Sequence, residues 1–539
     1  MSGRSLVPEL PLFEDEAAKA VRVFNRLRLP DVLGKPTLAE ATGDWFRDIV
    51  QALFGAYDPE TNDRHLQEVF LLVPKKNGKS TNAAGVMVTA AIVNRRPEAE
   101  LLLIAPTKEI ADISFRQASG MIRSDPDLER LFQLQRHIRT ITHRVSGAQI
   151  KIVAADTDAV TGAKATYILI DETHVFAAKP KAADVFVELR GALAARPDGF
   201  LFQITTQSKS PPAGVFKAEL QSAREVRDGE QDLPLLPVLY EFPEEIAAED
   251  GWKRPEHFGL VNPNLGRSVN VAFLARELGK AEREGPEKLA LFASQHLNIE
   301  IGLNLRSDRW AGAVHWLPAS QPMTLEDLLD RSEAVVVGID GGGLDDLLGL
   351  YVLGRERGTR RWLGWGRAWV HRGVLELRKS EAPRMLDFER DGDLVIVDDL
   401  AEANEQLAAL VLQVHEAGLL AQVGLDLFGP TDAADALAQV GIDPEIVVGV
   451  QQGWRLNGSI KTVEVRLSNR TMAPATQGLM AWCVGNAKAV AAGNAVTITK
   501  QAAGTAKIDP LVALFVAAAL MVRNPEARGR SFWETGDAA

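Results

Sequence analysis

A nine-residue stretch, VPKKNGKST at residues 73–81, has residue types that bind phosphate. Gly78, Lys79 and Ser80 supply the second half of the pattern G-x-x-x-x-G-K-[ST], whose first glycine would fall at Val73. In such loops, backbone N–H groups and a helix N-terminus face the phosphates, and the lysine adds a positive charge. We expect a nucleotide site with Lys79 on the β- and γ-phosphates and Ser80 on Mg²⁺. A lysine-rich turn before an amphipathic helix is the alternative.

An acidic pair ends a second apolar run, YILIDETH at residues 167–174. Carboxylates at the end of a buried strand can place one oxygen ligand near Mg²⁺ and leave the other group to polarise the attacking water. We expect Asp171 to take the metal and Glu172 the water. The alternative is an ordinary strand that ends in a helix-capping aspartate.

Polar residues also end a third apolar run, FLFQITTQS at residues 200–208. Thr205, Thr206 and Gln207 would lie where they can sense a γ-phosphate and couple its loss to movement. Without the two motifs above, these residues would be ordinary turn residues.

Three further carboxylates could form a second site. Asp340 ends the run VVVGID, Asp426 lies in QVGLDL, and Asp509 precedes Pro510 in KIDPLVAL. Brought together, they could hold two divalent ions that clamp a phosphodiester, which is RNase H-like chemistry, and Asp346 is a candidate accessory ligand. The alternatives are that Asp340 is a turn residue and that Asp509 is a helix N-cap.

The elements that would position these residues follow an α/β pattern. Short β-rich runs alternate with segments of helical period over residues 66–206, which predicts a wound, mostly parallel sheet. Prolines interrupt residues 208–330, and a second α/β pattern then begins with hairpin-like spacing. The β-rich runs are VFLLV, LLLIA, IKIVAA, YILID and FLFQITT, followed in the second pattern by VVVGID, LGLYVLG, WLGWGRAWV and QVGLDLFG.

The chain of 539 residues is too long for one hydrophobic core. We expect an α/β P-loop ATPase domain followed by an RNase H-like α/β nuclease domain. The predicted parts are an N-terminal segment (1–60), the P-loop ATPase core (61–207), an ATPase subdomain and connector (208–332), the nuclease domain (333–525) and a loose tail (526–539).

The composition limits the partners. The single cysteine, Cys483, excludes an internal disulfide and a multi-cysteine metal site. A net charge of −12 argues against a protein coated with nucleic acid over its whole surface, although a local basic channel is compatible with it. No apolar stretch approaches the ~20 residues that a membrane span needs, so we expect no membrane contact.

These motifs together resemble the large terminase subunit of tailed bacteriophages, over roughly residues 35–525. Members tolerate a phosphate loop without its first glycine and often carry an early basic residue, which Lys75 matches. In many members, a glutamine that recognises adenine follows the tryptophan that precedes the ATPase core. Here Phe46 follows Trp45, which puts adenine recognition by such a glutamine in doubt. Further matching segments are APTKEIADISFRQA, DTDAVTGAKATYILIDETH, ITTQS, LPVLYEF and VNPNLG.

The resemblance implies an ATP-driven motor that moves double-stranded DNA into a procapsid, with a two-metal endonuclease that cuts concatemers. It implies ATP and Mg²⁺ as cofactors, with Mn²⁺ as an alternative for the nuclease. The implied partners are DNA, the portal protein, the small terminase subunit and further copies in a ring, in the host cell cytoplasm.

The resemblance also extends the residue predictions. Nucleotide-binding residues would be Lys75, Asn77, Gly78, Lys79, Ser80, Thr81 and Asp171. Arg190 and Arg196 are candidates for a trans-acting arginine, and Lys500 and Lys507 are candidate contacts to the DNA backbone. Two other functions stay open: a helicase-like translocase with a non-catalytic RNase H-like domain, and an assembly protein that uses ATP only as a switch.

Overall fold

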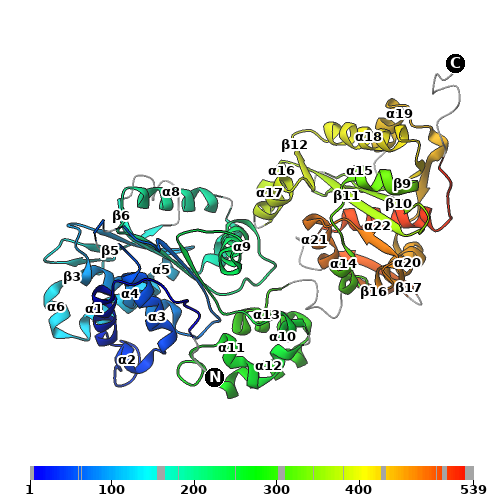
Figure 1. Ribbon diagram of the computed structural model, residues 1–539. Helices are drawn as coiled ribbons and strands as arrows, with labels where there is room; N and C mark the ends of the chain where they lie inside the picture. Colours follow the sequence, from blue (N-terminus) through cyan, green and yellow to red (C-terminus); the bar gives the residue numbers. More distant parts are fainter. Residues whose placement is uncertain are drawn as a thin grey trace. The chain divides into compact units, whose positions relative to one another are not determined.

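The chain divides into two compact units, Met1–Ile301 and Gly302–Ala539. In the computed structural model (Figure 1), each unit is built on its own β-sheet. The structure describes residues 5–58, 60–61, 63–154, 164–179, 181–248, 250–301, 310–343, 345–379, 381–426, 432–492, 495–500 and 507–527. The two units are described separately below.

The first unit contains an eight-stranded sheet in the order β3-β4-β5-β2-β6-β7-β1-β8. All pairings from β5 to β8 are parallel, and β3 and β4 extend the sheet as an antiparallel hairpin. The strands are β1 (Glu68–Leu72), β2 (Glu100–Ala105), β3 (Phe132–Gln135), β4 (Thr140–His143), β5 (Gln149–Ala154), β6 (Ala165–Asp171), β7 (Phe200–Thr205) and β8 (Leu235–Leu239). The predicted wound, mostly parallel α/β sheet is therefore confirmed.

Burial on both faces explains the continuous apolar runs of the central strands. All seven residues of β6 and all six of β7 are buried, as expected for parallel strands covered by helices on both sides. The helices and 3₁₀ segments of this unit are α1 (Glu14–Arg26), α2 (Leu38–Ala41), α3 (Asp44–Gly55), α4 (Lys79–Val93), α5 (Lys108–Arg123), α6 (Pro126–Leu131), η1 (Thr173–Ala178), α8 (Ala182–Ala194), α9 (Gly214–Asp228), α10 (Glu244–Ala248), η2 (Gly251–Lys253), η3 (Pro255–His257), α11 (Phe258–Val261), α12 (Val271–Glu284) and α13 (Pro286–Leu297).

The parallel register brings three predicted motifs to one edge of this sheet. Leu72 of β1 pairs with Thr205 of β7, and Asp171 of β6 pairs with Ile204. The carboxyl ends of β1, β6 and β7 therefore lie side by side. Ligands bind at this edge in wound α/β sheets, so the three predicted motifs lie where a nucleotide site is expected.

The second unit has a mixed sheet in the order β12-β11-β10-β9-β13-β14, and β15 pairs with β11. Strands β9, β10 and β11 are antiparallel, whereas β13 runs parallel to β9 and β14 parallel to β13. The strands are β9 (Ser332–Gly341), β10 (Leu348–Glu356), β11 (Trp362–His371), β12 (Leu394–Val397), β13 (Leu420–Asp426), β14 (Val447–Val450) and β15 (Met472–Pro474), with a separate hairpin of β16 (Ala487–Ala492) and β17 (Ala495–Lys500).

Helices cover both faces of the second sheet. Val336 packs in one core with α20, α21 and α22, while Val335 and Val337 pack in another with α15, α18 and α19. The helices and 3₁₀ segments are α14 (Ala313–Ala319), α15 (Leu325–Arg331), α16 (Gly373–Leu377), α17 (Ala382–Arg390), α18 (Leu400–Glu416), α19 (Asp432–Gln439), η4 (Pro444–Ile446), η5 (Gly453–Leu456), α20 (Asn457–Ser468), α21 (Gly478–Asn486) and α22 (Asp509–Met521). Cys483 of α21 is fully buried.

Glycines let α22 lie close to the strands. A Cβ at Gly338 of β9 would meet the Ala513 backbone oxygen at 2.1 Å, and one at Gly349 of β10 would meet the Pro510 nitrogen at 2.6 Å. A Cβ at Gly424 of β13 would meet the Val516 side chain at 2.6 Å. A side chain at any of these three strand positions would overlap α22.

The unit boundary differs from the predicted domain boundary. The first unit ends at Ile301, so α14 and α15 belong with the second sheet, whereas the predicted connector extended to residue 332. Within the described residues, no helix is long and apolar enough to cross a membrane.

Candidate active sites

The phosphate loop is a turn between β1 and α4, and Gly78 makes it possible. Gly78 has φ of 77°, a left-handed conformation that glycine adopts without a Cβ penalty, and Lys79 begins α4 immediately after it. Thr81 is the third residue of this helix. The loop backbone and the helix N-terminus therefore have the arrangement that binds phosphate.

Lys79 and Glu172 form an ion pair at the centre of the site. Lys79 Nζ lies 2.8 Å from Glu172 Oε1, and their side chains are only 9% and 18% exposed. Burial opposes ionisation of Glu172, but the Lys79 ammonium and the contact with His174 outweigh it, and the pKa of Glu172 falls to about 2. Glu172 also holds a left-handed φ of 59°, which a non-glycine residue adopts at a cost of ~1–3 kcal/mol. Glu172 is thus an ionised carboxylate.

Asp171 is the more deeply buried member of the acidic pair, with 2% exposure. Ser114 of α5 donates a hydrogen bond of 3.3 Å to its Oδ2. Burial raises the pKa of Asp171 to about 6, while Lys79 and hydrogen bonds from Ser80 and Ser114 act in the opposite direction. The Ser80 hydroxyl and the Asp171 carboxylate are hard oxygen donors next to each other, which suits Mg²⁺.

His174 is a site residue that the motif analysis missed. Its Nδ1 lies 3.2 Å from Glu172 Oε2 and 3.2 Å from Thr205 Oγ1, and its backbone N–H donates to Thr205 Oγ1 at 3.0 Å. The residue was visible in the motif DETH, but its position two residues after Glu172 carries no chemical meaning until the turn of η1 is known. His174 joins the acidic pair to the residues at the end of β7.

The three residues at the end of β7 are buried and each contacts a different part of the site. Thr205 contacts His174, and Thr206 Oγ1 donates to the Val73 carbonyl at 3.1 Å, where the phosphate loop begins. The Gln207 N–H donates to Asn298 Oδ1 at 3.2 Å, just after α13. The predicted coupling residues therefore connect β1, η1 and the end of α13.

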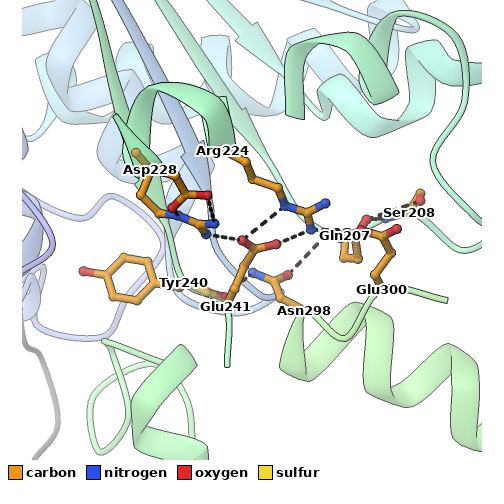
Figure 2. A network of polar contacts seen from close by, with 9 residues as sticks. Gln207, Ser208, Arg224, Asp228, Tyr240, Glu241, Asn298 and Glu300 are labelled. Carbon is orange, nitrogen blue, oxygen red and sulfur yellow. Dashed lines mark hydrogen bonds and ion pairs between the residues drawn. The ribbon is translucent and has the colours of Figure 1, made fainter. Parts of the chain in front are cut away.

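A polar network continues from Gln207 (Figure 2). Asn298 donates to the Tyr240 carbonyl at 3.0 Å, and the next residue, Glu241, forms ion pairs with Arg224 and Arg227 of α9. Arg224 also lies 2.8 Å from Glu300. These contacts connect the end of β7 with α9, β8 and the last residues of the first unit.

The segment VNPNLG, at residues 261–266, braces the phosphate loop. Asn77 is fully buried, donates to Asn262 Oδ1 at 2.8 Å and accepts from the Asn264 N–H at 3.0 Å. Asn264 Oδ1 accepts a hydrogen bond of 3.3 Å from the Trp45 indole. Asn77 therefore holds the loop in place through this segment.

Two other predicted residues lie beside the loop. Lys75 donates its backbone N–H to the Gln295 carbonyl at 2.9 Å, and burial together with the nearby Lys209 lowers its pKa. Lys75 and Lys209 line one cavity of about 290 Å³ with residues of α12 and α13. Phe46 is fully buried and stacks on Phe24, so it occupies the hydrophobic core.

The three carboxylates of the second unit lie at one edge of its sheet. Gly424 of β13 pairs with Gly338 of β9, and Asp426 and Asp340 each follow two residues later. Side chains two residues apart point to the same face of a strand, so both carboxylates emerge on the face that α22 covers. A Cβ at Gly341 would lie 3.3 Å from the Asp509 Cβ.

No group of three or more acidic, histidine or cysteine side chains in the described ranges is arranged to hold a metal ion. Gln452 donates to Asp340 Oδ1 from beyond β14. The two-metal site remains a prediction that rests on the shared edge of the three carboxylates.

The structure contradicts one prediction near this edge, Lys507 as a DNA contact, and one alternative, Asp509 as a helix N-cap. Lys507 is 1% exposed, so burial prevents it from contacting DNA. It forms an ion pair of 2.6 Å with Asp346, so its ammonium would compete with a metal ion for this proposed accessory ligand. Ile508 is the N-cap of α22 and Asp509 is its first helical residue, so Asp509 does not cap the helix. The side chain of Lys500 lies outside the described residues.

The candidate trans-acting arginines are held within the first unit. Arg190 forms ion pairs of 2.7 Å with Glu68 and with Glu219, and Arg196 donates to the Lys164 carbonyl at 3.1 Å. Glu68 begins β1, so Arg190 lies at the sheet edge opposite the phosphate loop.

Comparison with known proteins finds a family match within the first unit. Residues 44–224 match the family model "Terminase large subunit, ATPase domain". The predicted resemblance to large terminase subunits is confirmed. The terminase ATPase match covers the phosphate loop, the acidic pair and the end of β7. Protein YmfN of Escherichia coli (strain K12) is 21% identical over 368 residues, 65% of this chain and 76% of that protein.

Solved large terminases span most of the chain. The HK97 bacteriophage large terminase is 18% identical and covers 94% of this chain and 99% of its own, with a TM-score of 0.46. The large terminase of a thermophilic bacteriophage, solved in complex with ADP, is 11% identical and covers 86% and 96%, with a TM-score of 0.29. The terminase nuclease of the thermophilic phage G20c is 12% identical and covers 39% and 96%, with a TM-score of 0.27.

Proposed function

We propose that this chain is the motor subunit of phage DNA packaging, in which ATP hydrolysis by the first unit drives double-stranded DNA into a procapsid. The observation that carries the proposal is the buried Lys79–Glu172 pair beside Asp171, within the residues that match the terminase ATPase domain. Its partners would be the portal protein, the small terminase subunit and further copies in a ring, in the host cell cytoplasm.

Each residue of the site in the first unit would have its own role in ATP hydrolysis. Lys79 and the start of α4 would bind the β- and γ-phosphates, and Ser80 with Asp171 would hold Mg²⁺, which neutralises charge on the phosphates when bound. Glu172, an ionised carboxylate with a pKa of about 2, would orient the attacking water and accept its proton.

The second unit would cut concatemeric DNA with a metal-dependent RNase H-like site. Three antiparallel strands β9–β11, followed by the parallel strands β13 and β14 on the other side of β9, support this proposal. Asp340, Asp426 and Asp509 are the candidate catalytic carboxylates, with Mg²⁺ or Mn²⁺ as the candidate metals.

A second function stays open. The second unit would then be a non-catalytic scaffold on a DNA translocase. Plasmid cleavage in the presence of Mg²⁺ or Mn²⁺ distinguishes the two functions, because a scaffold leaves the plasmid intact.

The central test compares the purified chain with Glu172→Gln. The amide cannot accept the proton of water, so we expect the variant to bind ATP and to hydrolyse it at least ~100-fold more slowly. Equal loss of binding and hydrolysis would show that Glu172 is structural. An unmodified chain that binds ATP without turnover would identify an ATP-switched assembly protein.

A further inference from the structure

We propose that His174 is a positioning residue of the ATPase: its ring is hydrogen-bonded to Thr205 and lies against the Glu172 carboxylate, which it keeps in place. The inference rests on the proposed function of Glu172 and adds a residue to it. His174 is 7% exposed and lies between the acidic pair and the end of β7.

The hydrogen bonds around Thr205 determine which ring nitrogen carries a proton. The Thr205 hydroxyl accepts from the His174 backbone N–H at 3.0 Å and donates to the Thr206 carbonyl at 3.1 Å. Its proton is therefore not available to the His174 ring. Glu172 is an ionised carboxylate and can only accept. His174 Nδ1 lies 3.2 Å from both oxygens. It must be protonated to donate to Thr205 Oγ1, and it makes a close polar contact with Glu172 Oε2 that lacks hydrogen-bond geometry.

The contact with His174 becomes more important when Lys79 binds phosphate. Lys79 Nζ lies 2.8 Å from Glu172 Oε1 and is the ammonium beside that carboxylate. An ammonium has three donors, and phosphate oxygens would compete with Glu172 for them. His174 Nδ1 lies 3.2 Å from the opposite carboxylate oxygen, Oε2, and this contact does not depend on the phosphates. It can therefore keep Glu172 oriented towards the water during hydrolysis.

The same ring makes the position of Glu172 depend on β7. Thr205 is followed by Thr206, which bonds to the start of the phosphate loop, and by Gln207, which bonds to Asn298. A shift of β7 that moves Thr205 would move His174 with it. The catalytic carboxylate is thereby linked to the network that reaches Arg224 and Glu300 (Figure 2).

The test uses two substitutions in the full chain. His174→Leu keeps bulk near Phe216 but removes the donor, and His174→Asn keeps a donor close to the position of Nδ1. We expect His174→Leu to lower kcat about 10-fold or more while the Kd for ATP changes by less than about 3-fold. His174→Asn should recover most of kcat. Equal kcat in the parent chain and in a folded His174→Leu variant would overturn the inference.

The comparison of kcat, Kd and stability separates positioning from a purely structural role. A positioning role predicts that kcat falls in His174→Leu and recovers in His174→Asn, while the Kd for ATP and the unfolding temperature of the first unit stay close to those of the parent chain. Parallel losses of kcat, ATP affinity and unfolding temperature that His174→Asn does not recover would contradict the proposal.

A third variant keeps the proposal testable if His174→Leu does not fold. Thr205→Val removes the hydrogen-bond acceptor of Nδ1–H and leaves the His174 ring beside Glu172, so it should lower kcat less than His174→Leu does. Glu172→Gln shows whether the proposed function itself holds. If Glu172→Gln abolishes turnover but the His174 and Thr205 variants leave kcat unchanged, only this inference fails.

Discussion

The positive charge of Lys79 pairs with Glu172 and would also bind the phosphates of ATP. Lys79→Ala should abolish ATP hydrolysis, because no neighbouring side chain can replace that charge on the β- and γ-phosphates. It should also destabilise the first unit by about 1–3 kcal/mol, since buried Glu172 loses a charged partner.

Lys108→Ala is the matched control for this variant. Lys108 also begins a helix that follows a parallel strand of the same sheet, but it is exposed. Turnover and thermal unfolding of both variants check the prediction. Normal turnover in a folded Lys79→Ala variant would contradict the assignment of the phosphate loop.

The buried carboxyl of Asp171 predicts how activity depends on pH. The pKa of Asp171 is raised from 3.8 to about 6. Between these pH values the folded state keeps a proton that the unfolded state has lost, so the free energy of unfolding decreases as the pH rises. Mg²⁺ needs the ionised form, so hydrolysis should fall as the pH drops through about 6. Excess Mg²⁺ favours that form and should move the acid limb to lower pH. Measuring kcat/KM against pH at two Mg²⁺ concentrations checks this, and a limb insensitive to Mg²⁺ would argue against Asp171 as a ligand.

At the level of elements, close helix packing on the second sheet depends on glycine. Gly338→Ala should destabilise the second unit by about 1–3 kcal/mol, because the new Cβ would overlap the Ala513 backbone of α22. Gly458→Ala in α20 is the control, since it has open space and should be neutral or slightly stabilising.

Thermal unfolding and ATPase rate of both glycine variants check the prediction. ATPase activity should persist in each of them, because the substitution lies in the other compact unit. Equal unfolding temperatures for the two variants would show that the sheet and α22 can move apart at little cost.

The elements that could be predicted from sequence are those whose signal is local. The central parallel strands are continuous apolar runs, and the loop before α4 contains a recognisable glycine and lysine. The hairpin of β3 and β4 was missed because FQLQ and TITH are short and partly polar. Strand β8 was missed because Pro237 is a strand breaker, yet β8 pairs only with β1 at the edge of the sheet, where proline is tolerated.

The sites show the same division between local and tertiary information. The proximity of Asp171, Glu172 and Lys79 could be predicted from their positions at the ends of apolar runs. The proximity of His174 to Thr205 and the bracing of Asn77 by Asn262 depend on segments 31 and 185 residues apart, which no local pattern records. Burial of Lys507 likewise follows from the packing of α22 and could not be predicted from its charge.

At the level of the whole molecule, the two proposed activities should be separable. Asp171 and Asp426 lie in different compact units, each with its own sheet. Asp426→Ala should therefore abolish plasmid cleavage and leave ATP hydrolysis unchanged, and Asp340→Ala and Asp509→Ala should do the same. ATPase rate, plasmid nicking and unfolding temperature on the three variants check this. Cleavage that survives in all three would identify the second unit as a scaffold.

The single buried cysteine makes the chain suitable for optical measurements of its motion. Cys483 is fully buried, and burial raises the pKa of its thiol, so it should react slowly with maleimide dyes. The exposed positions Ala39 and Ser468 lie in different units and could each be replaced by cysteine. A donor and an acceptor fluorophore could then be attached without removing the native thiol. Energy transfer between them would report changes in distance between the two units during each ATP turnover.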